Sequence, residues 1–594
     1  MLVFMKNTVI YFICLILSVT TFAQPQCRCQ PHQTCWPMTK DWQQLAQQLS
    51  GRLVKPQSPT QICNQHPTSK DCQMALQAMH NPFYMQSKPG NTESQGWLGA
   101  WHSQPSKYAI EAVNASDVIA GVNFARQHNL RLVIKGAGHD YLGRSSAPNS
   151  LLIWTHKMDQ LHYDYHFTPA GCPLNTRPVQ AVTVAGGVRW IQTYSLVTTQ
   201  HHRYVQGGGC TTVGSAGGFI QGGGFGSWSK NYGAAAASIL QAKIVTADGK
   251  LLTVNRCQHA DLFWGLKGGG GGTFGVVTQM TLKTYPLPKT FGLVQGTLKA
   301  VSDKAYKKLL KKFLIFYRQH LLNKHWGEML HFNSNNTIGI ALVYQGLSKS
   351  YVKKLWAQWH MPIKITAFPP AKTWDLNYWK QHKPKMVIPN NFEGSAPGQY
   401  WWAGDDGQVS EYWYTYQSWW LPIKFFALDH INQTAQLFYN ASRYHNFSLH
   451  IQKGLAGGSK LALAGQTKTS LNPAAYHAAT LVLMAAGTTK YYPGVKGSRL
   501  NKREAFTQLK AVNKAMALFR AAAPNTGSYA NEADYFQKNW QHAFWGNNYE
   551  RLLAIKNKYD PRGLFYCHHC VGSEYWQAQG MCRSDRLKSK KNTT

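Results

Sequence analysis

The chain has 594 residues, of which 44% are hydrophobic and 13% aromatic, and its formal net charge is +37 at pH 7. This length and apolar content exclude a disordered or fibrous protein and predict a folded chain with more than one domain. The positive charge favours contact with polyanionic surfaces. Because no nucleic-acid-binding motif accompanies the charge, specific recognition of nucleic acid is not expected.

Residues 1–23 have the pattern of a secretory signal peptide. Lys6 precedes an apolar stretch, and the small-residue end at Ala23 resembles a cleavage site. The stretch is too short and too early for a spanning helix, and no second apolar run of eighteen residues follows. We therefore predict a secreted protein, extracellular or periplasmic, without a transmembrane segment. An uncleaved N-terminal anchor is the alternative.

Residues 24–104 form a cysteine-rich N-terminal segment. Removal of Cys14 with the signal peptide leaves eleven of the twelve cysteines, and an odd number in a secreted protein indicates one thiol with another role. If that thiol is Cys210, ten cysteines remain for disulfides. Eight of these crowd the two ends of the chain, so we expect disulfides that staple the ends, in a pairing that the sequence does not reveal.

From about residue 105 the pattern alternates between helix and strand. An apolar-periodic stretch at 117–130 predicts a helix with Ser116 as its N-cap. The β-rich runs predict strands at 131–136 and 181–187, a hairpin at 237–254 with its turn at Asp248-Gly249, and a strand within 272–288.

Residues 291–520 mix basic amphipathic stretches with short β-rich runs, which predicts an α+β domain. Within it, residues 303–321 are expected to be helical, and 337–344 and 447–454 to be strands. Residues 521–594 form a C-terminal segment rich in aromatic and polar residues.

Three glycine-rich loops lie at 136–146, 207–226 and 268–275. The stretch 270–275 fits GxGxxG, but a strand-like run follows it, which excludes a Rossmann fingerprint, and the P-loop pattern is missing from the sequence. Glycine loops let backbone approach a ligand, and their amides hold phosphate oxygens. Three such loops predict a large phosphate-bearing cofactor; three tight turns are the alternative.

Four segments carry a family resemblance: "KGAGHDYLGRSS" (135–146), 207–233, 261–278 and "NNYERLLAIKNKYDPRGLF" (547–565). In this order they resemble the FAD-linked oxidases of the berberine-bridge-enzyme-like group, within the vanillyl-alcohol-oxidase superfamily. "NEADYF" and "HHCVGSEYW" are most similar to the fungal isoamyl-alcohol-oxidase-like members. The resemblance implies an α+β fold class with a PCMH-type two-part FAD-binding domain. Its parts are 105–290 and 521–594, with a substrate domain, 291–520, inserted between them.

The resemblance also implies that FAD is attached covalently at two residues. The histidine of the "GHDY" motif, His139, would bond to the 8α carbon of the flavin, and Cys210 would bond to C6. A thiolate is a good nucleophile toward an electron-poor ring. Without the motifs, an inert buried thiol and a hydrogen-bonded turn histidine are the alternatives. The other residues that the resemblance implies for FAD binding are Gly136, Ala137, Gly138, Asp140, Gly143, Arg144, Ser145, Thr211, Val213, Gly214, Gly217, Gly218, Gly223, Gly226, Val276, Asn547 and Tyr549.

The implied reaction is oxidation of a CH–OH group in an alcohol or carbohydrate by hydride transfer to FAD, which requires a base for the hydroxyl proton. Many relatives carry a catalytic tyrosine in a "YxNYxD" motif; here Tyr529, Asn531 and Asp534 match it, but Glu532 replaces that tyrosine. Glu532 is either the base or a structural partner of a basic residue. Tyr141 matches an active-site tyrosine of the family.

Three further residues, His450, Gln452 and Lys453, lie where relatives place substrate-side polar groups. Val213 occupies a position at which valine admits oxygen in plant relatives, which favours O2 as the electron acceptor and H2O2 as a product. A dehydrogenase with another acceptor and an inactive basic surface-binding protein are the alternatives. The expected substrate is a small molecule or an oligosaccharide, and the aromatic cluster 400–420 would either stack on it or fill a core.

The "CHHC" stretch at 567–570 has a spacing that is unusual for zinc, because neighbouring side chains rarely converge on one ion. We therefore predict a disulfide there and no metal site.

Overall fold

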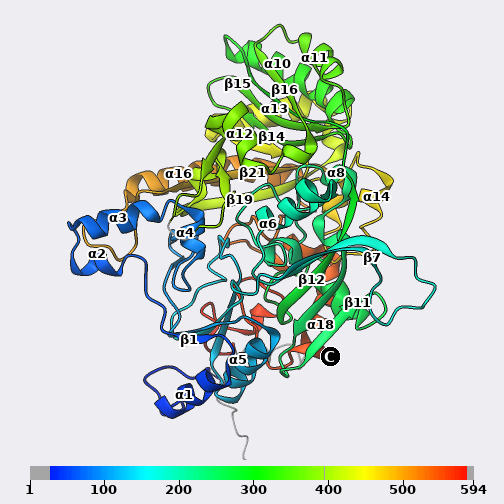
Figure 1. Ribbon diagram of the computed structural model, residues 1–594. Helices are drawn as coiled ribbons and strands as arrows, with labels where there is room; N and C mark the ends of the chain where they lie inside the picture. Colours follow the sequence, from blue (N-terminus) through cyan, green and yellow to red (C-terminus); the bar gives the residue numbers. More distant parts are fainter. Residues whose placement is uncertain (1–26, 393–394, 585–594) are drawn as a thin grey trace, which may run out of the picture.

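The computed structural model describes residues 27–392 and 395–584, and Figure 1 shows their arrangement. The predicted signal peptide and Cys14 lie outside the described residues. Within that part of the chain, no helix is long and apolar enough to cross a membrane.

The half of the molecule that carries the glycine-rich loops contains two sheets. A four-stranded sheet has the order β1-β4-β6-β5, in which β4, β6 and β5 run parallel. A second, antiparallel sheet has the order β11-β10-β12-β8-β7, with β9 paired to β12. The strands are β1 (Arg52–Val54), β4 (Tyr108–Glu111), β5 (Arg131–Lys135), β6 (Ser150–Trp154), β7 (Leu161–Phe167), β8 (Val179–Ala185), β9 (Arg203–Val205), β10 (Ile239–Val245), β11 (Leu251–Asn255) and β12 (Val276–Pro286).

The predicted hairpin is confirmed as β10 and β11, and Gly249 adopts the left-handed φ of 80° that its turn requires. The predicted helix is also confirmed, as α5 (Ala115–Gln127), but its N-cap is Asn114 rather than Ser116. The side-chain oxygen of Asn114 accepts a hydrogen bond from the Asp117 amide at 3.0 Å. Because Asn114 has extended backbone and Ser116 already lies in the first turn, only Asn114 can act as the cap.

A nine-stranded sheet forms the other half, in the order β16-β13-β15-β14-β20-β21-β19-β2-β3. All neighbours are antiparallel except β19 and β2, and β2 and β3 come from the N-terminal segment. The strands are β2 (Gly96–Trp97), β3 (Trp101–His102), β13 (Phe291–Lys299), β14 (Trp326–Phe332), β15 (Thr337–Gln345), β16 (Ile363–Phe368), β19 (Tyr412–Pro422), β20 (Phe447–His450) and β21 (Ala478–Thr488). A separate pair joins β17 (Val387–Pro389) to β18 (Tyr400–Trp402).

Helices cover one face of this sheet (Figure 1), and their apolar stripes explain why. In α16 (Lys502–Ala522), Val512, Met516 and Phe519 recur at helical spacing and are fully buried. The predicted helix at 303–321 is confirmed as α10 (Asp303–Phe316) followed by a π-helical turn. The other longer helices are α1 (Thr39–Gln48), α3 (Lys70–Ala78), α11 (Lys349–Ala357), α13 (Ile431–Tyr444) and α18 (Tyr549–Tyr559).

The strand predicted at 337–344 is confirmed as β15. The strand predicted at 447–454 is only half right, because β20 ends at His450 and the chain then turns. This turn carries Gln452 and Lys453 to the edge of a cavity.

The described chain contains both long-range and local disulfides, and the predicted stapling of its ends is confirmed. One of them, Cys27–Cys582, ties the two ends together, and the predicted disulfide in "CHHC" is Cys567–Cys570. Cys210 is the free cysteine of this part of the chain. The remaining pairs are Cys29–Cys35, Cys63–Cys72 and Cys172–Cys257.

Candidate active site and cofactor cavity

A cavity of about 740 Å³ lies between the glycine-rich loops and the nine-stranded sheet. All three glycine-rich loops contribute to its lining, so the predicted convergence is confirmed. The loops approach one another more closely than side chains would allow. A Cβ on Gly271 would lie 2.5 Å from the Gly218 Cα, whereas a Cβ on Gly209 would meet no atom within 4 Å of it in the described chain. The loops therefore expose backbone atoms to the cavity.

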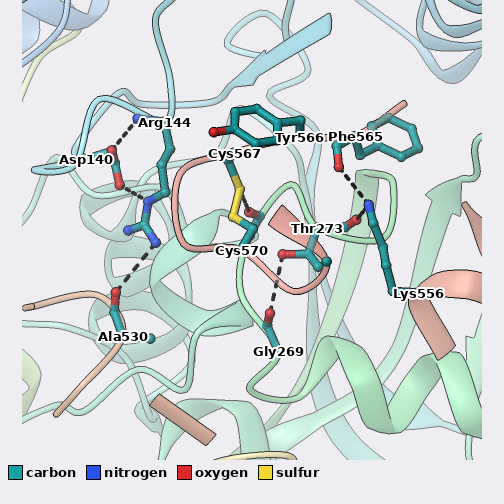
Figure 2. Close-up of a disulfide and its surroundings, with 12 residues drawn as sticks. Asp140, Arg144, Gly269, Thr273, Ala530, Lys556, Phe565, Tyr566, Cys567 and Cys570 are labelled. Carbon is teal, nitrogen blue, oxygen red and sulfur yellow. Dashed lines mark hydrogen bonds and ion pairs between the residues drawn. A yellow bond between two sulfur atoms is a disulfide. The ribbon is translucent and has the colours of Figure 1, made fainter. Parts of the chain in front are cut away.

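Figure 2 shows Lys556 of the C-terminal segment beside Thr273 of the third glycine-rich loop. The Lys556 ammonium on α18 donates to the carbonyls of Thr273 and Phe565, each at 2.6 Å, and to Asp560 at 2.7 Å. All of these contacts are buried. The third glycine-rich loop is therefore held by a residue almost three hundred positions further along the chain.

His139 is oriented by two partners on one side of its ring. Its Nε2 lies 2.9 Å from a carboxylate oxygen of Glu93 and 2.8 Å from the Thr212 hydroxyl. Its Nδ1 makes no hydrogen bond to any described residue, and His139 lines the cavity. An imidazole whose Nε2 is held by a carboxylate is fixed in orientation, with Nδ1 left available.

Cys210 lines the same cavity as His139, and its Sγ lies 3.6 Å from the Thr212 hydroxyl. Burial raises the pKa of the thiol well above its usual range, and the nearby carboxylates of Asp405 and Glu93 raise it further. The thiol therefore stays protonated at neutral pH unless a neighbouring group takes its proton.

Most of the residues expected to bind FAD line this cavity. Those that do, besides His139 and Cys210, are Gly136, Ala137, Gly138, Asp140, Arg144, Ser145, Val213, Gly214, Gly217 and Gly218. Those outside the lining are Gly143, Thr211, Gly223, Gly226, Val276, Asn547 and Tyr549. Thr211 instead donates to the Tyr400 carbonyl at 2.7 Å, and Tyr549 donates to Glu574 at 2.5 Å.

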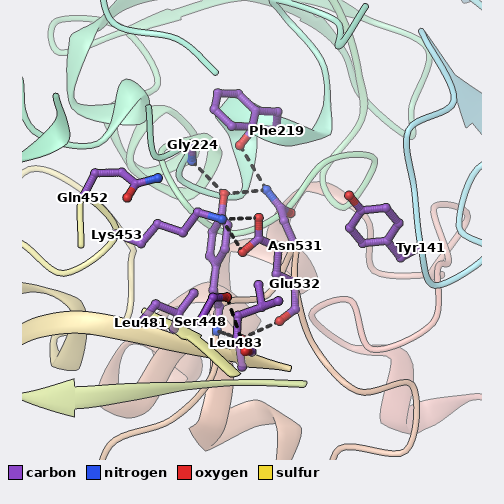
Figure 3. A network of polar contacts seen from close by, with 12 residues as sticks. Tyr141, Phe219, Gly224, Ser448, Gln452, Lys453, Leu481, Leu483, Asn531 and Glu532 are labelled. Carbon is purple, nitrogen blue, oxygen red and sulfur yellow. Dashed lines mark hydrogen bonds and ion pairs between the residues drawn. The ribbon is translucent and has the colours of Figure 1, made fainter. Parts of the chain in front are cut away.

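On the sheet side, Glu532 forms an ion pair with Lys453 (Figure 3). The Lys453 ammonium donates to both carboxylate oxygens, at 2.5 and 2.6 Å. Glu532 thus has the basic partner that the sequence left open, and both residues line the cavity. An ion-paired carboxylate at a cavity wall is held in a fixed position, where it can also accept a proton from a ligand.

The two candidate tyrosines line the cavity as neutral phenols. Burial raises the pKa of Tyr529, and the Glu532 carboxylate raises it further; the same two causes raise that of Tyr141. The Tyr529 oxygen accepts hydrogen bonds from the Gly224 amide at 3.0 Å and the Asn531 side chain at 2.9 Å. Tyr141 donates to Gln408 at 3.1 Å.

Asp534 does not line the cavity. Its carboxylate accepts a hydrogen bond from the Phe536 amide at 3.0 Å, and burial raises its pKa. His450 and Gln452 do line it, and burial lowers the pKa of His450 well below its usual value, so this imidazole is neutral.

Sequence reasoning missed three carboxyl groups at the site: Glu93, Glu328 and Asp405. Glu328 lines the cavity from β14 with a left-handed φ of 71°, which is rare for a residue with a side chain. Its carboxylate accepts from Ser227 and, at 3.4 Å, from Gln452, and burial raises its pKa. No motif surrounds these residues, so only their place in the fold reveals them.

Comparisons with known proteins agree with this site. The model of an FAD binding domain matches residues 106–255, and the model described as "Berberine and berberine like" matches 528–572. An uncharacterized FAD-linked oxidoreductase of Arthroderma benhamiae is 31% identical, over 94% of this chain and 96% of that protein. The chain therefore belongs to the berberine-bridge-enzyme-like family and is an FAD-dependent oxidoreductase.

Two solved structures share the fold. A VAO-type flavoprotein from Myceliophthora thermophila is 26% identical with a TM-score of 0.76, over 94% of this chain and 100% of that chain. The glucooligosaccharide oxidase of Acremonium strictum, described as holding a 6-S-cysteinyl, 8α-N1-histidyl FAD, is 20% identical with a TM-score of 0.62. That alignment covers 83% of this chain and 95% of the oxidase. The resemblance in fold class is confirmed.

The residues of the cavity fit FAD. The glycine loops leave room for backbone contact with phosphates and with a flat ring, and an imidazole and a thiol stand at the same cavity. In the described residues, no cluster of three or more side chains could hold a metal ion.

Proposed function

We propose that this protein is a secreted oxidase that removes hydride from a CH–OH group and holds its FAD through two covalent bonds. The observation that carries the proposal is the pairing of His139 and Cys210 at one cavity. His139 has its Nε2 engaged and its Nδ1 free, and Cys210 is the cysteine that the described disulfides leave unpaired. The 8α-N1-histidyl link in the Acremonium enzyme uses the ring nitrogen that corresponds to Nδ1.

When bound, FAD supplies the hydride acceptor for this reaction. In our proposal, Glu532 accepts the proton of the substrate hydroxyl, and its ion pair with Lys453 holds the carboxylate in place. Tyr141 and Tyr529 stay neutral because burial raises their pKa values, so they serve as hydrogen-bonding groups around the substrate rather than as bases. Glu328 and Gln452 line the same wall and would orient a second polar group of the substrate.

We propose a neutral alcohol or an oligosaccharide as the substrate. The cavity continues past Cys210 between aromatic side chains, with the ring centres of Trp374 and Trp402 5.8 Å apart and those of Trp379 and Trp402 5.4 Å apart. Such rings can stack on a sugar or on an aromatic alcohol. Val213 lines the cavity and supports O2 as the acceptor, and the five disulfides support a secreted protein.

The first experiment is a peptide map of the exported protein. We expect flavin on both His139 and Cys210, and yellow colour that stays with the protein after acid precipitation. Peroxide release is then measured on a panel of oligosaccharides, aliphatic alcohols and aromatic alcohols. A colourless precipitate with both peptides unmodified contradicts the covalent attachment. Turnover with a dye but without peroxide contradicts the oxidase and favours a dehydrogenase.

A further inference from the structure

β18 and the segment that follows it are tied to the loops carrying Cys210 and His139 by three hydrogen bonds. The Thr211 hydroxyl donates to the Tyr400 carbonyl at 2.7 Å, and the Trp402 indole donates to the Gly209 carbonyl at 3.0 Å. At the other end, the Tyr141 hydroxyl donates to Gln408 at 3.1 Å. The short 3₁₀ helix Ala403–Gln408 is therefore fastened on both sides.

This segment places Asp405 at the Cys210 thiol. Both residues line the cavity, and the Asp405 carboxylate is close enough to raise the pKa of the Cys210 thiol. Although Asp405 as a whole is half-buried, its Oδ2 atom is out of reach of solvent and has no hydrogen-bond partner in the described chain. A shielded carboxylate without a compensating cation is costly, so its retention points to a chemical role.

The other acceptors near the thiol face the His139 imidazole. A carboxylate oxygen of Glu93 lies 2.9 Å from the His139 Nε2, and the Thr212 hydroxyl, 3.6 Å from Sγ, also contacts that nitrogen. Burial raises the pKa of Asp405 to about 6, close to the range in which a carboxylate is both ionised and able to accept a proton at neutral pH.

We propose that Asp405 is the base that deprotonates Cys210 when the second covalent bond to FAD forms. The proposal rests on the bicovalent attachment proposed above. The S–H proton passes to the Asp405 carboxylate, and the sulfur forms a bond to C6 of the oxidised ring. The C6 hydrogen leaves as a proton, and dioxygen takes up the two electrons left behind together with two protons. One thiol, one C6–H bond and one O2 thus give one thioether and one H2O2.

The test compares Asp405→Asn with the unchanged protein and with Asp406→Asn, an exposed neighbour in the same helix. Each protein is expressed with the full chain, exported and denatured without reductant. Thiol titration and peptide mass mapping then report the state of Cys210, and the His139 peptide reports the first bond. Residual apoprotein is incubated with FAD in air, and the rate of attachment at Cys210 is followed at about pH 7 and about pH 9.5.

We expect D405N to keep the bond at His139 but to form the bond at Cys210 about 10²-fold more slowly at pH 7, with a free thiol titrating in the denatured chain. Because the pKa of the buried thiol is raised, its small thiolate fraction grows about tenfold for each pH unit, so attachment in D405N should accelerate strongly at the higher pH; a purely structural role would not respond to pH in this way. The charged and titratable groups facing the thiol are Asp405, Glu93, His139, Tyr141 and Tyr194. D406N behaves like the unchanged protein.

Attachment at Cys210 in D405N at the unchanged rate overturns the proposal, as does a loss in Thr212→Val that exceeds the loss in D405N. If the unchanged protein itself carries no flavin on Cys210, the bicovalent attachment fails instead, and the two failures are distinguishable. If D405N is not exported, Asp405→Ser takes its place with the same expectation, and Asp405→Glu should restore attachment.

Discussion

The wall of the cavity made by the glycine-rich loops presents backbone, whereas the wall made by the nine-stranded sheet presents side chains. On the loop wall, residues such as Gly271 and Gly218 come so close that no side chain fits between them. On the sheet wall, Glu328, Lys453 and Glu532 reach the cavity from segments far apart in the sequence. Cofactor contacts made by backbone demand a fixed local pattern, while substrate contacts made by side chains tolerate many.

This difference separates two kinds of failure. Damage to the loop wall should lower the amount of cofactor that the protein incorporates, or loosen the fold around it. Damage to the sheet wall should leave the cofactor bound and change the reaction. Four variants test this separation, in order of decreasing expected effect.

The largest effect is expected for Glu532→Gln on the sheet wall. Loss of the proton acceptor should lower kcat by about 10²–10⁴-fold, while the ratio of flavin to protein stays unchanged. Steady-state kinetics and the absorbance of bound flavin measure both. Glu550→Gln, an exposed change in α18, is the matched control. If E532Q loses flavin as well, the two walls are not independent.

On the loop wall, Lys556→Met should cost about 3–5 kcal/mol of unfolding free energy, because it leaves the buried Asp560 carboxylate without its cation. It also removes the hydrogen bond to Thr273, so flavin contacts should weaken together with stability. Chemical denaturation measures the first effect, and the ratio of flavin to protein in the exported variant measures the second. Lys558→Met breaks the exposed pair with Asp261, which solvent screens, and should cost much less stability. Equal losses in the two variants would contradict the assignment.

The disulfide between the chain ends supports the same half of the molecule. Replacing Cys27 and Cys582 with serine should cost about 2–5 kcal/mol of unfolding free energy, because the bond closes a loop with a sequence separation of 555. The paired change at Cys29 and Cys35 opens a separation of only 6 and should cost less. Thermal unfolding without reductant ranks the two variants, and the reverse order would refute the loop-length argument.

The smallest effect concerns pH and the sheet wall. Burial raises the pKa of Glu411, just before β19, to about 8 from its ordinary value of 4.5. Between these values the carboxyl ionises in the unfolded chain but not in the fold, so this residue lowers stability as pH rises. Glu411→Gln removes the titration and should be more stable than the unchanged protein at pH 8. Melting curves near pH 4.5 should coincide; a difference that does not grow with pH contradicts the assignment.

Much of the loop wall was predictable because its signals are local. The glycine runs, the free Cys210 and the "GHDY" histidine are readable without knowing what lies opposite them. The hairpin at 237–254 was readable for the same reason, since Asp248-Gly249 sets its turn. The N-cap at Ser116 was wrong by two residues, because two neighbouring residues were both able to cap and the sequence does not say where the helix begins.

The sheet wall was only partly predictable. Glu532 was identified from its motif. Its partner Lys453 lies 79 positions away in the sequence, so only the fold places the Lys453 ammonium at the Glu532 carboxylate. Glu93, Glu328 and Asp405 had no local signal at all. A lone carboxylate in a sequence is most often solvated, and burial beside a cavity is a property of the surrounding elements.

The sequence by itself determined three features: a glycine-lined cofactor cavity, the candidate residues for bonding to the flavin, and an unpaired cysteine. It could do so because glycine conformation and residue chemistry act over a few positions. Only the tertiary structure decided which carboxylate lies near which side chain: Glu93 near His139, Asp405 near Cys210 and Glu532 beside Lys453. Their roles depend on distance, burial and neighbouring charge, and these arise when segments far apart in the chain pack around one cavity.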